Sequence, residues 1–412
     1  MSDKRDNEPE VNKEEEAVPE ERRAVHTDIN SVRKNERSIR RMKRLIALLV
    51  VVLVGIAVYL TYPYWLPKLE GIFDKPASTI HNTADFEKGN FPIQPTEKTS
   101  NIFIVGNELM TADTHSLTFY DMNGKRLAPY AHGFSNPMTR VCGKRILVFD
   151  SGRYGFKMFN KKGEIYSKTT DDTILTGSLS ENGTAAIVTD SEKYASTVLF
   201  YNKEGKLIYR YNSTARVTSA TVNEDGKGAY VCTFSSVDGV IYSQVHQLDF
   251  SKDGEQLVSD NIQTLAIDCI ANEAGDIVIA GDSGIYTVSP EGKLVSGCEY
   301  DGDLVTFMLS RKCSAVLTTG GSKDMSKLII AQSGADDTEA YRTSDCPTSS
   351  KCVKVSDDRV LLLTTGEVYS YAFSGSLAAT ADIGREYINI GYYDGALFLA
   401  GKHGIDKIKF EM

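Results

Sequence analysis

Residue types that often perform catalysis occur in this 412-residue sequence mainly in short polar turns. The segment Gly281-Asp282-Ser283-Gly284 matches the motif around the nucleophilic serine of chymotrypsin-like proteases. A later segment in the same repeat phase, residues 400–405, places Lys402 and His403 in the corresponding turn, and no His and Asp partner set surrounds Ser283. We therefore interpret the motif as a turn between two strands.

Metal ligation and cofactor binding also lack a sequence signal. The six histidines show no His-x-x-x-His spacing, and no Gly-rich phosphate or dinucleotide motif opens a helix. The acid pairs at 171–172, 336–337 and 357–358 lack the alternating oxygen ligands of a calcium loop and read as solvated turns. We predict no metal and no cofactor.

All seven cysteines follow residue 100, and none forms a Cys-x-x-Cys pair. Most lie in apolar, strand-like segments, where a thiol behaves as a small buried hydrophobe. Cys346 and Cys352 flank a loop and could form a local disulfide in an oxidising compartment. The odd number leaves at least one thiol unpaired.

A repeating unit fills the chain from residue 101 onward. Its clearest mark is an apolar strand, a polar turn with a glycine, and a second strand. The turn glycines are Gly124, Gly163, Gly205, Gly254, Gly292, Gly334 and Gly375, with spacings of 39, 42, 49, 38, 42 and 41 residues. Two further strands precede each turn, and four short strands in roughly 40 residues are typical of a propeller blade.

The repeats predict an all-β fold, a β-propeller of eight blades, with seven as the alternative. The eighth unit ends at Phe410 after only three strands. Residues 86–94 are the natural source of its missing fourth strand. Pro92 is tolerated there because the fourth strand of a blade has a free outer edge.

The turns between the second and third strands vary in length and sequence, whereas those between the third and fourth are short and glycine-centred. Irregular loops on a rigid scaffold often carry function, and exposed Tyr and Arg are frequent hot-spot residues. Loop variety could equally reflect drift. The candidate partner-binding residues are Asp113, His115, Arg153, Tyr154, Lys193, Tyr194, Lys323, Asp324 and His403.

An uncharged apolar stretch precedes the repeats. Residues 45–62 form a run of 18 residues, long enough as a helix to span about 27 Å of bilayer. We therefore predict four parts: a disordered, basic-ended cytoplasmic tail (1–44), a transmembrane helix (45–62), an extracytoplasmic stalk (63–85) and the propeller (86–412). The tail is too long, and the aromatic residues after the span too bulky, for a cleaved signal peptide.

The charges around this span predict its orientation. Seven basic residues and one acid lie between Arg33 and Arg44, whereas residues 68–75 are balanced. Basic flanks stay in the cytoplasm, so we place the propeller outside the cell membrane. The formal net charge is −9, and the part after residue 44 accounts for −10. An acidic outer domain without a basic stripe argues against a nucleic-acid partner.

The basic-flanked anchor and the glycine-turn repeats together resemble an uncharacterised, clostridial-type family of single-pass membrane proteins with a domain of unknown function. The resemblance implies an extracytoplasmic WD40-like or quinoprotein-like propeller. It implies no catalytic residue. The repeats depart from true WD40 units because they contain no Trp-Asp pair and no Trp at all.

The leading functional hypothesis is a membrane-anchored module that binds a protein or an envelope polymer. The alternatives are an extracytoplasmic enzyme, either a lyase or a glycan hydrolase, and an envelope signal sensor that acts through the tail. A propeller fold is compatible with each of them. No convergent set of acids, histidines and arginines at matched blade positions is recognisable, which favours binding over catalysis.

The predicted topology can be tested by protease accessibility. Protease added to intact protoplasts should digest residues 101–412 and spare residues 1–44, because the basic flank holds the tail inside. Immunoblotting with antibodies against each part measures both. Protection of the repeat domain would reverse the predicted orientation.

Overall fold

The structure is a computed structural model that describes residues 46, 49, 52, 53, 79–95, 101–321, 325–334, 340–356 and 358–411. The chain divides into two compact units, Met1–Lys75 and Pro76–Met412. In the first unit the four described residues are helical. Within the described ranges no helix is long and apolar enough to cross a membrane. The predicted tail and most of the predicted span and stalk lie outside these ranges.

The second unit is an eight-bladed β-propeller, and the alternative of seven blades is wrong. Blade 1 contains β2 (Asn101–Val105), β3 (Glu108–Ala112), β4 (Ser116–Tyr120) and β5 (Arg126–Ala131), and blade 2 contains β6 (Pro137–Cys142), β7 (Arg145–Asp150), β8 (Gly155–Asn160) and β9 (Gly163–Thr169). Blade 3 contains β10 (Ile174–Leu179), β11 (Ala185–Thr189), β12 (Ser196–Tyr201) and β13 (Leu207–Ser213), and blade 4 contains β14 (Arg216–Val222), β15 (Gly228–Val237), β16 (Val240–Asp249) and β17 (Glu255–Val258).

The remaining blades follow the same order. Blade 5 contains β18 (Ala266–Ala271), β19 (Ile277–Gly281), β20 (Gly284–Val288) and β21 (Leu294–Glu299), and blade 6 contains β22 (Leu304–Met308), β23 (Cys313–Thr319), β24 (Met325–Gln332) and β25 (Tyr341–Pro347). Blade 7 contains β26 (Cys352–Val355), β27 (Arg359–Leu363), β28 (Glu367–Ala372) and β29 (Leu377–Asp382), and blade 8 contains β30 (Tyr387–Tyr393), β31 (Ala396–Gly401) and β32 (Gly404–Lys409).

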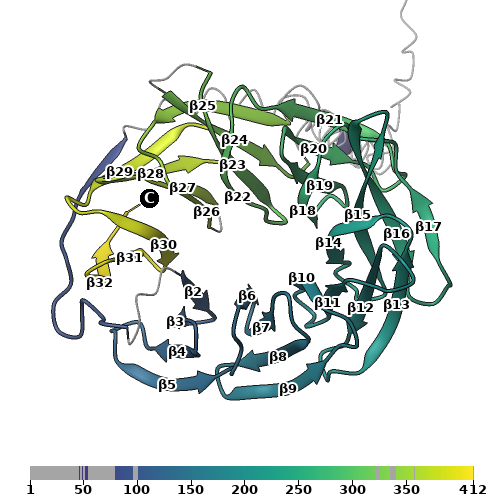
Figure 1. The fold of residues 1–412 in the computed structure, drawn as a ribbon. Helices are drawn as coiled ribbons and strands as arrows, with labels where there is room; N and C mark the ends of the chain where they lie inside the picture. The colour runs from purple at the N-terminus through teal and green to yellow at the C-terminus, as the bar shows by residue number, and fades with distance from the viewer. Residues whose placement is uncertain are drawn as a thin grey trace, which may run out of the picture. The chain divides into compact units, whose positions relative to one another are not determined.

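In each blade the strands pair antiparallel in chain order, and the first strand lies nearest the axis of the ring (Figure 1). The core is divided among the blade interfaces. One cluster, for example, joins Phe149 and Phe156 of blade 2 to Ile187 of blade 3, and the next joins Phe200 of blade 3 to Val231 of blade 4. Eight such clusters occupy the eight interfaces. The middle strands are therefore apolar on both faces, as β12 illustrates with six buried residues.

The repeated turn glycines have a conformational function. Gly205 has a φ of 79°, which is costly for residues with a Cβ atom. A Cβ atom on Gly205 would also lie 2.7 Å from Cγ of Tyr166 in the preceding blade. Positive φ therefore explains why the glycine recurs, and the close packing of adjacent blades reinforces it here.

Residues 86–94 close the ring, as the sequence predicted. Phe86 and Ile93 form antiparallel bridges with Ile408 and Ile405 of β32, and the amides of Ile93 and Ile405 each donate to the other's carbonyl at 2.9 Å. The side chains of Phe91 and Ile93 are 6% and 4% exposed and pack between blades 8 and 1. The contact consists of isolated bridges rather than a continuous strand.

A second N-terminal contact was not predicted. β1 (Ile80–Thr83) pairs in parallel with β29 as a fifth strand of blade 7, although the sequence assigned it to the stalk. Asn82 also binds the chain's other end: its amide donates to the Glu411 carbonyl at 3.0 Å and its side-chain oxygen accepts from the Glu411 amide at 2.9 Å. The propeller's own contacts thus begin before residue 86.

Removal of the closing segment should destabilise the ring. A chain that starts at Lys98 should melt well below one that starts at Pro76, because it loses the burial of Phe91 and Ile93, worth about 1.5–3 kcal/mol for each side chain, and exposes β32 as an edge. Differential scanning calorimetry measures the difference. The matched variant Phe91→Ala in the longer chain should lose about 3–5 kcal/mol. Equal melting temperatures for the two chains would contradict this account.

Candidate functional site

The sequence-predicted loops lie on one face of the ring. Because neighbouring strands are antiparallel, the turns between second and third strands share a face with the connections between blades. We call this surface the loop face. Asp113 and His115 follow β3, Arg153 and Tyr154 follow β7, Lys193 and Tyr194 follow β11, and His403 follows β31. Lys323 and Asp324 lie outside the described residues.

Blades 8, 1, 2 and 3 are successive, so the described candidates follow one arc of the loop face. The loops of blades 2 and 3 are also joined physically. The Gly152 amide donates to the Ile174 carbonyl at 2.8 Å, and the Asp190 amide donates to the Thr173 carbonyl at 2.9 Å. Both loops are therefore anchored to the single connection between β9 and β10.

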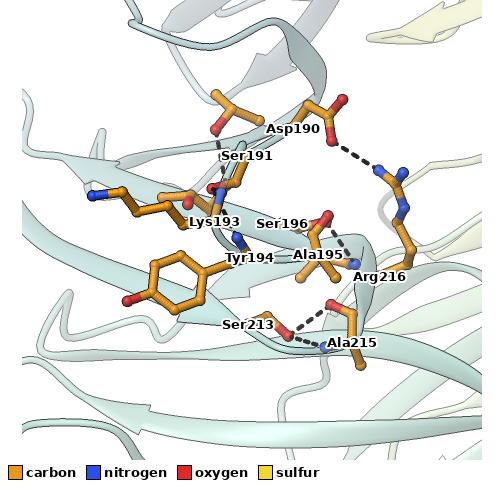
Figure 2. A network of polar contacts seen from close by, with 12 residues as sticks. Asp190, Ser191, Lys193, Tyr194, Ala195, Ser196, Ser213, Ala215 and Arg216 are labelled. Carbon is orange, nitrogen blue, oxygen red and sulfur yellow. Dashed lines mark hydrogen bonds and ion pairs between the residues drawn. The ribbon is translucent and has the colours of Figure 1, made fainter.

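Two tyrosines stand out from this anchored backbone. Tyr154 is 51% exposed and Tyr194 is 43% exposed. Figure 2 shows the Tyr194 ring and the Lys193 ammonium extending away from the hydrogen bonds of the loop. Beside them the Arg216 guanidinium binds the Asp190 carboxylate at 3.0 Å. Large side chains on a fixed backbone lose little additional freedom on binding, which suits them to contact a partner.

Asp113, another candidate residue, is engaged in hydrogen bonds within its own turn. The Asp113 carboxylate accepts from the amides of His115 at 2.8 Å and Ser116 at 2.6 Å, as in an Asx turn. His132, which the sequence did not single out, is buried beneath this turn and its Nε2 lies 3.2 Å from the Asp113 carbonyl. Burial lowers the pKa of His132, so the neutral ring supports the loop.

The protease-like motif is a turn, as its position in the repeat predicted. The Asp282 carboxylate accepts from the Thr264 hydroxyl and the Leu265 amide, both at 2.9 Å. The Ser283 hydroxyl donates to the Thr264 hydroxyl at 2.9 Å. These groups hold the connection from blade 4 against the β19–β20 turn.

The disulfide considered between Cys346 and Cys352 is not formed. Both are free thiols in the structure. Cys346 packs among the residues between blades 6 and 7, whereas Cys352 packs against those between blades 7 and 8. The two side chains therefore serve opposite faces of blade 7.

A second candidate region, which the sequence analysis missed, is the axial funnel. It is a cavity of about 1160 Å³ lined by the innermost strands of all eight blades and by the turns that follow them. We call the face on which these turns lie the hairpin face. A single sequence gives little signal for the funnel, because its lining residues are scattered at intervals of one blade.

An arginine connects distant blades across the mouth of this funnel. The Arg311 guanidinium of blade 6 lies 2.8 Å from the Glu224 carboxylate of blade 4 and 3.9 Å from the Glu181 carboxylate of blade 3. Its backbone carbonyl accepts from the Glu273 amide of blade 5 at 2.9 Å. The pair with Glu224 lowers the pKa of that carboxyl group and raises the pKa of Arg311.

The fold and these two surfaces define the protein as an eight-bladed β-propeller with a loop face and an axial funnel. It belongs to the family described as DUF5711, a family of unknown function, which matches residues 88–410. Within the described ranges, no group of three or more His, Cys, Asp or Glu side chains is placed to hold a metal ion.

Solved structures share the fold at low sequence identity. The computationally designed Ika8 protein aligns with a TM-score of 0.55 and 12% identity over 76% of this chain and 97% of its own. BamB from Moraxella catarrhalis gives 0.49 and 12% over 76% and 94%, and apo AztD from Citrobacter koseri gives 0.48 and 10% over 70% and 88%. No protein in the curated comparison matches the sequence significantly.

The charges of the funnel can be tested through Cys142 in its wall. Burial, with a smaller effect from Glu181, raises the pKa of the Cys142 thiol to about 11, and Arg311 opposes the rise. The thiolate is the reactive form, so Glu181→Gln should lower this pKa and speed iodoacetamide labelling at pH 8. Each half unit by which the pKa of Cys142 falls should raise the labelling rate about threefold.

Arg311→Gln should have the opposite effect and slow the labelling of Cys142, as measured by mass spectrometry of the alkylated peptide. Cys313 is the internal control. Burial alone raises the pKa of Cys313 to about 12, so neither substitution should alter its rate. Unchanged labelling of Cys142 in both variants would show that these charges do not act on the thiol.

Proposed function

We propose that the protein is a membrane-anchored, extracytoplasmic propeller that binds a protein or cell-envelope partner and acts as a scaffold. The observation that carries this proposal is the pair of exposed tyrosines, Tyr154 and Tyr194, on loops fixed to a shared backbone segment. Tyr and Arg are the side chains most often found at binding hot spots. Arg153, 64% exposed in its side chain, lies beside Tyr154.

The proposed location is supported by the sequence before the propeller. Residues 45–62 carry no charge, and a basic cluster precedes them. A span in that orientation holds the N-terminus in the cytoplasm and the propeller outside. A tethered propeller would meet partners in the envelope at high effective concentration, so a moderate intrinsic affinity would suffice.

The partner class follows from the surface chemistry of the loop face. Aromatic rings and two cations on blades 2 and 3 suit a protein surface with apolar and acidic groups. The negative balance of the propeller disfavours long anionic polymers, because repulsion acts over about a Debye length of 8–10 Å. Among envelope polymers, neutral or cationic chains are therefore the better candidates.

The assigned face can be tested with two variants of the full chain. The first replaces Arg153, Tyr154, Lys193 and Tyr194 with Ala. Loss of a single hot spot of about 2 kcal/mol weakens affinity about thirtyfold. This variant should therefore bind envelope partners at least about thirtyfold more weakly and capture correspondingly less of them. Quantitative cross-linking on intact cells, followed by mass spectrometry, measures the loss.

The matched control changes four lysines in turns of the hairpin face: Lys125, Lys162, Lys206 and Lys293. It should capture partners as the unaltered chain does. If this control abolishes capture while the loop-face variant retains it, the partner binds the opposite face. Intact capture by both variants would remove both surfaces from consideration.

A further inference from the structure

The axial funnel narrows into a smaller polar cavity of about 110 Å³. Four residues line both spaces: Arg140, Ser178, Ala220 and Asp268. The smaller cavity is formed by the first strands of blades 2 to 6, together with Val188 of β11. It therefore lies within the lumen, at the junction with the wide space that opens toward the hairpin face.

Arg140 brings an uncompensated positive charge to this junction. It lies in the middle of β6 and is partly buried. Within the described residues its guanidinium has no ion-pair or hydrogen-bond partner, whereas Arg311 in the same funnel binds two carboxylates. A guanidinium in a concave site presents a fork of donors that matches a carboxylate in a bidentate arrangement.

Asp268 supplies the opposite charge from blade 5. Its Oδ1 atom accepts from the Ser219 hydroxyl at 2.6 Å and from the Cys269 amide at 2.9 Å. These two donors fix the carboxylate, and Oδ2 has no further partner in the part of the chain that the structure describes. Among the described residues that line the smaller cavity, one carboxylate is thus preoriented and one guanidinium is unpaired, and they come from different blades.

The walls between these charges suit a small peptide-like molecule. Thr176 and Thr218 line the smaller cavity, together with the apolar residues Ile267 and Phe307. Each innermost strand pairs on one side only. Its other edge has no neighbouring strand and faces the lumen. Side chains bind some of its backbone groups, as the Ser178 hydroxyl binds the Ala220 carbonyl, and edges of this kind can also bind peptide groups.

We propose that the lumen binds a small zwitterion, an amino acid or a short peptide with free ends, whose carboxylate binds Arg140 and whose ammonium binds Asp268. A simple anion is attracted by Arg140 but repelled by Asp268. A simple cation is attracted by Asp268 but repelled by Arg140. Only a ligand with both charges gains at both walls. This inference does not depend on the partner proposed for the loop face.

Isothermal titration calorimetry of the full chain with alanine and dialanine tests the proposal. At least one of them should bind, and their comparison indicates which ligand length spans the two charges. N-acetyldialanine lacks the ammonium and dialanine amide lacks the carboxylate, so each should bind at least about tenfold more weakly, the factor that 1.4 kcal/mol represents. All of these titrations use the unaltered chain, so their outcome does not depend on whether a variant folds.

Two substitutions assign the charges. Arg140→Gln should weaken binding of the zwitterion about tenfold or more. It should not weaken binding of the amide, which has no carboxylate to lose and is relieved of the repulsion by Arg140. Asp268→Asn should behave in the same way toward the N-acetyl compound. Arg126→Gln on β5 and Asp253→Asn in an exposed turn are matched controls that should bind normally.

Three results would overturn the proposal. One is the absence of binding by both zwitterions. Another is equal affinity for dialanine and acetate, which would define a plain anion site. The third is normal binding of the zwitterion by Arg140→Gln, with a melting temperature that shows the variant to be folded.

Discussion

Each blade of the propeller buries its apolar faces against the blades on either side, and this packing governs the whole fold. A middle strand such as β12, buried along its whole length, must be covered on both faces, and a sheet of four short strands cannot cover itself. Each blade is therefore stable only between two neighbours. Every blade has two neighbours only when the ring is closed. The last interface, between blades 8 and 1, is completed by the N-terminal residues Phe91 and Ile93.

After the ring closes, two surfaces are not covered by the packing of the blades: the loop face and the wall of the lumen. On the loop face, connections such as that between β9 and β10 fix the turns of two blades at once. In the lumen, the first strand of every blade pairs with a neighbouring strand on one side only and lines the axial cavity. Functional sites need rigid support, and both surfaces are built on backbone that strand pairing or loop hydrogen bonds hold in place.

Ion pairs join several blades at the mouth of the funnel. Arg311 links blades that are not neighbours, and its two carboxylate partners remain substantially exposed. Exposed ion pairs contribute little to folding, so these contacts add little to the stability of the ring. In the smaller cavity, Asp268 is fixed by hydrogen bonds, while Arg140 has no counter-ion among the residues that the structure describes.

The repeat and most of its strands could be predicted from the order of residues alone. Glycine is needed wherever a hairpin turn requires positive φ, so the period of the glycines marks each blade. The three strands at the C-terminus similarly required a donor segment, which residues 86–94 supply. These signals are local, or follow from counting strands, and a single chain reveals them.

The contacts between residues far apart in the chain became apparent only in the folded ring. β1 joins blade 7 although nothing in its four residues indicates a parallel partner. Arg140 and Asp268 line one cavity although 128 positions separate them, and Arg311 reaches Glu181 across several blades. Such contacts depend on the radius and closure of the ring. Those properties arise from the sum of all eight interfaces, and no local pattern encodes them.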